Sequence, residues 1–143
     1  MVVRTLKSEP APAMSEPAPR PRPPRPWREK FRDALRGIKW GVRGHSSFFV
    51  HFFCAAGVLA AAFVLGLGPL QWAVLVLCIG LVFAAELFNS AVETLFRGLD
   101  AATQERSWRA LDIAAGAVLV ASLTAAAVGA LVFLDRLRDL LGW

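Results

Sequence analysis

Three long, almost uncharged apolar segments limit what this chain can fold into. They run from Phe48 to about Leu67, from Leu70 to about Phe96, and from Ala110 to about Leu134. Each is close to or above the roughly 20 residues that a helix needs to cross a hydrocarbon core about 30 Å thick. A soluble fold of 143 residues, 56% of them hydrophobic, could not enclose so much apolar surface, because small folds leave most helices with one wet face. The sequence therefore predicts an all-α membrane protein with three transmembrane helices.

The segment just before the first span has an amphipathic pattern. Between Trp27 and about Arg43, apolar residues recur at helical spacing along one face, and lysines and arginines occupy much of the remainder. This pattern is typical of a basic helix that lies in the headgroup region of a membrane. The helix is either a simple anchor or a platform whose bases also reach nucleotide phosphates.

The chain is predicted to divide into two parts. Residues 1–26 are rich in proline and arginine, and proline blocks helical hydrogen bonds and favours extended chain. We expect a disordered tail there, followed by a membrane domain over residues 27–137 that consists of the interfacial helix and the three spans.

The basic residues predict a membrane surface as partner and fix an orientation. Of 16 Lys and Arg residues, 11 precede Gly44, within a formal net charge of +5. This basic arm runs straight into a membrane span and carries no nucleic-acid-binding motif, so no nucleic-acid partner is expected. Further arginines occupy the loop between the second and third spans, whereas the turn at 66–71 has none. We therefore expect a multi-pass protein of the plasma or inner membrane, with a cytoplasmic amino terminus and an external carboxyl terminus.

Polar residues interrupt the second span and open the third. Glu86, Asn89 and Glu93 are spaced i, i+3 and i+7, which places them on one helical face, and Asp112 begins the third span on the same side of the membrane. An ionised carboxylate at the centre of a bilayer costs about 2.5–3.5 kcal/mol on insertion scales, so such residues usually mark function. The alternative is polar contact between helices, with help from Ser90.

These residues suit chemistry on phosphate at a membrane surface. Carboxylates near the cytoplasmic boundary, beside the bases of the interfacial helix, can hold Mg²⁺ and a polyphosphate, because Mg²⁺ takes oxygen ligands. Glu86 lies deeper and could accept a proton from a lipid hydroxyl that arrives laterally. The sequence has no Gly-rich phosphate loop and no protein-kinase catalytic motif, so a phosphotransferase here would need an unrelated architecture.

The polar run also carries a resemblance to a known family. The segment from Ala85 to Glu93 (AELFNSAVE) resembles the signature E-[IL]-x-N-[ST]-A-[IV]-E of the prokaryotic diacylglycerol kinase and undecaprenol kinase family. Residues 31–38 are similar to the family's interfacial helix, and residues 112–118 to the start of its third span. The resemblance covers roughly residues 27–134.

The resemblance implies a function and a site. Members of the family transfer the γ-phosphoryl group of ATP, with Mg²⁺, to the hydroxyl of diacylglycerol or undecaprenol, and they are homotrimers. Carried over by position, Glu86 is the catalytic base and meets the lipid substrate together with Ser90. Glu93 is the metal ligand, and it shares nucleotide binding with Asn89 and Asp112. The expected partners are thus a membrane lipid, ATP and two further copies of the chain.

Three positions depart from the family pattern. His45 stands where the family has a second metal-binding glutamate, Leu111 where it has a lysine, and Arg97 where it has an aspartate. Imidazole suits softer metals than Mg²⁺, and the lost lysine removes a phosphate contact. These departures keep open a second interpretation, a catalytically degenerate relative that acts as a non-enzymatic membrane scaffold. A small transporter subunit is a third, which would have to build its pathway by oligomerisation.

Overall fold

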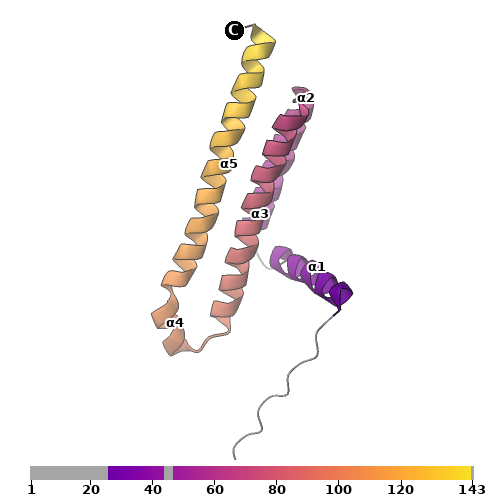
Figure 1. Ribbon diagram of the computed structural model, residues 1–143. Helices are drawn as coiled ribbons and strands as arrows, with labels where there is room; N and C mark the ends of the chain where they lie inside the picture. The colour runs from indigo at the N-terminus through magenta and orange to yellow at the C-terminus, as the bar shows by residue number, and fades with distance from the viewer. Residues whose placement is uncertain (1–25, 44–46, 143) are drawn as a thin grey trace, which may run out of the picture.

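The structure, a computed structural model, describes residues 26–43 and 47–142. The predicted tail, apart from Pro26, and His45 therefore lie outside the described residues. Within these ranges the chain forms only helices, shown in Figure 1: α1 (Trp27–Arg43), α2 (Ser47–Val64), α3 (Pro69–Arg97), α4 (Ala101–Ser107) and α5 (Arg109–Leu141). Among the described residues, α2, α3 and α5 are long and apolar enough to cross a membrane. The predicted fold class is confirmed.

Helix α3 lies at the centre of the arrangement. It packs against α5 along one side and against α2 on another, and it also contacts α1 (Figure 1). The outward faces of the three long helices carry exposed apolar side chains, such as Phe53 on α2, Leu77 on α3 and Leu123 on α5. Lipid is the environment in which such faces are stable, because exposing apolar side chains to water costs free energy and lipid removes that cost.

Helix α1 lies beside the same end of the long helices as α4 (Figure 1). Its apolar side chains Phe31, Leu35 and Ile38 remain exposed, as expected for a face that inserts between lipid headgroups. The helix meets α3 through Gly41, where an added Cβ would lie only 2.6 Å from Cδ2 of Leu87. A glycine at this position therefore allows the close approach of α1 to the middle of α3.

The turn between α2 and α3 is set by Gly66. This residue adopts a left-handed conformation, with φ of 63°, that glycine reaches without steric cost. Its amide donates to the Phe63 carbonyl, and the Leu67 amide donates to the Ala62 carbonyl, which together form a Schellman motif. The first span was predicted to reach Leu67, but α2 ends at Val64.

Arg136 connects this turn to α5, the third long helix, through a hydrogen bond. Its Nε donates to the Leu65 carbonyl at 2.9 Å, and the residue is half-buried. The last carbonyls of a helix have no partner within the helix, so the guanidinium satisfies one that α2 leaves open. The contact joins segments 71 residues apart in the sequence.

We expect Arg136→Ala to destabilise the fold by about 0.5–1.5 kcal/mol, the usual net contribution of such a hydrogen bond. Thermal unfolding in detergent should show a lower midpoint for this variant. Arg138→Ala is the matched control, because Arg138 lies two positions away on α5 and is exposed. Equal midpoints for the two variants would mean that the bond to Leu65 contributes nothing.

The structure differs from the sequence prediction in two places after α3. The loop between the second and third spans contains the short helix α4, which Asp100 caps by accepting hydrogen bonds from the Thr103 hydroxyl and amide. These bonds, the hydroxyl first, hold the pKa of Asp100 below its usual value. Helix α5 also continues to Leu141, beyond the predicted ends at Leu134 for the span and 137 for the domain, because the charged turn there contains no helix breaker before Gly142.

Candidate functional site

Glu86 is the most deeply placed acidic residue of the described chain. It lies on α3 with 2% of its surface exposed. The Ser47 hydroxyl donates a hydrogen bond to its Oε1, and Nε2 of His51 lies 3.9 Å from its Oε2. Ser47 and His51 are four residues apart, so the first turns of α2 present both to the same face of α3. Each carboxylate oxygen of Glu86 therefore faces a different polar group on α2.

Aromatic rings pack between α2 and α3 next to the residues of this site. Phe48, which follows Ser47 and is buried, stacks on Phe83 with ring centroids 6.2 Å apart. The Phe52 ring lies 5.8 Å from Phe83 in a tilted arrangement. Burying an unpaired carboxylate is unfavourable, so the hydroxyl and the imidazole are the groups that make this placement tolerable.

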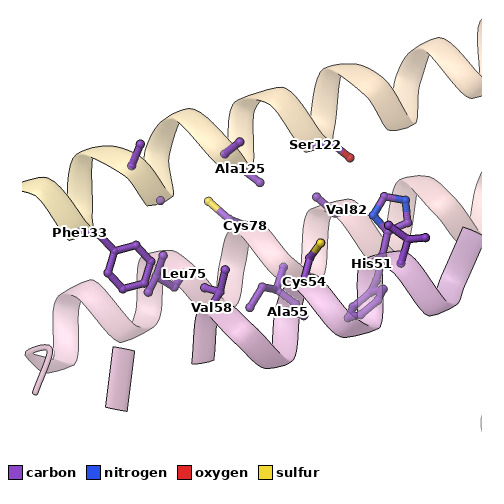
Figure 2. Close-up of a pocket in the computed structure, with 16 residues that line it drawn as sticks. His51, Cys54, Ala55, Val58, Leu75, Cys78, Val82, Ser122, Ala125 and Phe133 are labelled. Carbon is purple, nitrogen blue, oxygen red and sulfur yellow. The ribbon is translucent and has the colours of Figure 1, made fainter. Parts of the chain in front are cut away.

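An apolar cavity of about 450 Å³ adjoins this site between α2, α3 and α5. Figure 2 shows His51 at one end of it, with Leu75 and Phe133 toward the other. Almost all of its lining is aliphatic, aromatic or thiol, and Glu86 itself does not line it. A long hydrocarbon chain with a polar group at one end matches this distribution of apolar and polar lining.

Asn89 and Glu93 form a second polar pair one turn further along α3. The Asn89 amide donates to Oε1 of Glu93 at 3.0 Å, and Glu93 is half-buried. Asn89 also lines a second cavity of about 840 Å³ between α3 and α5. Ser90, in contrast, is 1% exposed and lines neither cavity, and its hydroxyl has no hydrogen-bond partner in the described part of the chain.

Asp112 lies in the first turn of α5 and is exposed. Its carboxylate makes no hydrogen bond or ion pair with another residue within 26–43 and 47–142. In those same ranges no three His, Cys, Asp or Glu side chains gather as a metal cage. The Glu93 carboxylate and the Asn89 amide oxygen are nevertheless hard donors that suit Mg²⁺, which usually takes one or two carboxylates and completes its shell with water and phosphate.

The site residues predicted from the sequence stay a prediction, and that prediction gave no role to Ser47 or His51. His51 was visible as the one strongly polar side chain of the first span. A polar residue within an otherwise apolar span is the signal that could have pointed to it. Ser47 at the start of the span gave no such signal, since serine is common at the ends of helices.

Comparison with known proteins places the chain in a family. The sequence profile of the family described as prokaryotic diacylglycerol kinase matches residues 32–133, which include most of α1 and nearly all of the three long helices. The chain therefore belongs to the prokaryotic diacylglycerol kinase family, and it is a multi-pass membrane protein.

Two curated relatives extend this comparison. The undecaprenol kinase of Bacillus subtilis is 33% identical over 109 residues, which cover 76% of this chain and 89% of the relative. A diacylglycerol kinase of Synechocystis is 35% identical over 112 residues, which cover 78% of this chain and 64% of the relative. No solved structure shows a significant match to the chain.

Proposed function

We propose that this chain is a lipid kinase that transfers the γ-phosphoryl group of ATP to the hydroxyl of a membrane lipid, diacylglycerol or undecaprenol. The observation that carries the proposal is the buried Glu86 carboxylate, held by Ser47 and His51 beside an apolar cavity. A base at membrane depth next to a space for a hydrocarbon chain is what phosphorylation of a lipid hydroxyl requires. The names of the two relatives support the same class of reaction.

In this mechanism the residues of α3 divide the work. Glu86 takes the hydroxyl proton as the lipid oxygen attacks the γ-phosphorus, and ADP leaves. Ser90, one turn from Glu86, is assigned to the lipid side of the site, while Glu93, Asn89 and Asp112 would hold Mg²⁺ and ATP. Bound Mg²⁺ would supply neutralisation of phosphate charge, and positioning contributes most of the remaining rate enhancement in phosphoryl transfer.

Exposed bases of α1 can contribute to nucleotide binding. Arg32, Arg36 and Lys39 are exposed on α1, a helix that contacts α3. Their positive charges would attract the phosphates of ATP and the anionic headgroups of the same membrane leaflet. This placement gives the interfacial helix a role beyond anchoring.

The proposal is tested with purified protein in mixed micelles, γ-labelled ATP, and diacylglycerol or undecaprenol in separate reactions. Transfer of label to either lipid, dependent on Mg²⁺, is the expected result, and the lipid that is labelled identifies the acceptor. Protein that unfolds cooperatively in the same detergent but labels neither lipid would contradict the kinase assignment.

The bases also lead us to propose a cytoplasmic amino terminus in the plasma or inner membrane. Reporter fusions after Leu67, Gln104 and Trp143 should then report an external, a cytoplasmic and an external position. The turn after α2 and the end of α5 lie at the opposite end of the bundle from α4 (Figure 1), which fits this order. A cytoplasmic signal after Leu67 would contradict the proposed orientation.

A homotrimer is part of the same proposal. The cavity between α3 and α5 is lined largely by small residues, including Ala84, Ala114, Gly116 and Ala117. Small residues allow helices to pack closely in membranes, where the association of apolar faces has no hydrophobic driving force. A helix of a second copy would fill this groove, and chemical cross-linking in native membranes would show the number of subunits.

Specific observations keep the scaffold as a second candidate function. Leu111 and Arg97 replace groups that the family uses at the phosphate site, and the described residues bring no three acidic side chains together. A scaffold would stay inactive even after the family residues are restored. Activity that appears only in the His45→Glu, Leu111→Lys double variant would identify the chain as a degenerate kinase.

A further inference from the structure

His51 lies between Glu86 and the apolar cavity. Glu86 is 2% exposed and is absent from the lining of both cavities, whereas the half-buried His51 lines the cavity of about 450 Å³ at one end (Figure 2). Nε2 of the same imidazole lies 3.9 Å from Oε2 of Glu86. A hydroxyl group at this end of the cavity would therefore meet the imidazole before it could meet the carboxylate.

The two oxygens of Glu86 are not equivalent. Oε1 accepts the Ser47 hydroxyl, while Oε2 faces the imidazole. A separation of 3.9 Å is longer than a hydrogen bond, so a small side-chain rotation or one intervening water must close it. Imidazole can take a proton on one ring nitrogen and release a proton from the other.

We propose that His51 is a catalytic residue that relays the proton of the lipid hydroxyl to Glu86, an inference that rests on the proposed kinase function. As the lipid oxygen forms its bond to the γ-phosphorus and the bond to the ADP oxygen breaks, the hydroxyl proton passes to Nδ1. The proton on Nε2 passes to Oε2 of Glu86. The imidazole ends neutral in the other tautomer, and the carboxyl group holds the transferred proton until the site opens to solvent.

The surroundings of His51 contain few competing groups. Besides His51, the titratable residues that line the cavity are Cys54 on α2 and Cys78 on α3, and both are free thiols. The residues of α5 that line it have no titratable side chain, and Glu86 is the carboxylate that the imidazole faces. Within this lining, His51 is therefore the side chain that can pass a proton from the cavity to Glu86.

The test uses the full chain in mixed micelles, with the lipid that the wild type phosphorylates. His51→Gln retains a side chain that can donate to Glu86 but cannot relay a proton. We expect kcat to fall by about 10²-fold or more, with KM for ATP changed less than about threefold. Phe53→Leu, at an exposed position of the same helix, is the matched control and should keep the wild-type kcat.

A second variant separates proton relay from packing. His51→Ala should regain activity when imidazole is added, whereas its thermal unfolding midpoint should not respond to imidazole.

Full kcat in His51→Gln, or no rescue of His51→Ala by imidazole, would overturn the relay. A wild type that labels no lipid would instead overturn the kinase proposal, and the relay would fall with it.

Discussion

Replacing Glu86 with glutamine should lower kcat for lipid phosphorylation by about 10²–10⁴-fold, the usual contribution of a general base. Glutamine has nearly the same shape, and its amide can still accept the Ser47 hydroxyl, but it cannot take up a proton. Because Glu86 lies within the helix packing and not in the nucleotide region, KM for Mg·ATP should change little. Initial rates at saturating lipid, measured across ATP concentrations, separate these two effects.

Two further variants test the role of the Ser47 hydrogen bond and control for the chemical change from glutamate to glutamine. Ser47→Ala removes the hydrogen bond to Oε1 but leaves the base, so its activity should fall by about tenfold, the equivalent of a hydrogen bond to a charged group of about 1.5 kcal/mol. Glu105→Gln makes the same chemical change at an exposed position in α4 and should have no effect. Wild-type kcat in Glu86→Gln would remove Glu86 from the reaction.

The three spans could be predicted from the sequence because long apolar segments have few alternative structures. The predicted end of the first span was less accurate. Leu65 and Leu67 are apolar and extend the hydrophobic segment, whereas the left-handed conformation of Gly66 ends the helix at Val64. Helix α4 has seven residues and no apolar face long enough to give a periodic signal. Its formation depends on the cap at Asp100, which accepts from Thr103.

For the site, the sequence predicts positions along one helix but not the contacts between helices. The spacing of Glu86 and Glu93 follows from helix geometry and was predictable. The pairing of Glu86 with Ser47 and His51 depends on which side of α2 turns toward α3. Helix α2 is apolar around most of its circumference, so periodicity could not indicate that side.

The nucleotide end of the site provides the second large expected effect. Glu93→Gln should raise the Mg²⁺ concentration needed for half-maximal activity by about 10–100-fold, the range typical of altered metal shells. The amide replaces a charged oxygen ligand with a neutral one, while its own oxygen can still accept the Asn89 amide that now donates to Glu93 at 3.0 Å. The local structure should therefore persist, and kcat at saturating Mg·ATP should stay within a few-fold of the wild type because Glu86 remains in place.

A binding measurement distinguishes this loss of metal affinity from a loss of catalysis. Mg·ATP should raise the thermal unfolding midpoint of the wild type, because a ligand that binds only the folded state stabilises it by an amount that grows with the ratio of ligand concentration to Kd. The same addition should shift Glu93→Gln less, whereas Glu105→Gln should respond as the wild type does. If Glu93→Gln showed an unchanged Mg²⁺ requirement and an unchanged shift of the midpoint, the metal would have to be held elsewhere. Asp112 at the start of α5 would then be the next carboxylate to replace, since it is exposed and lies where the amino-terminal end of α5 meets solvent.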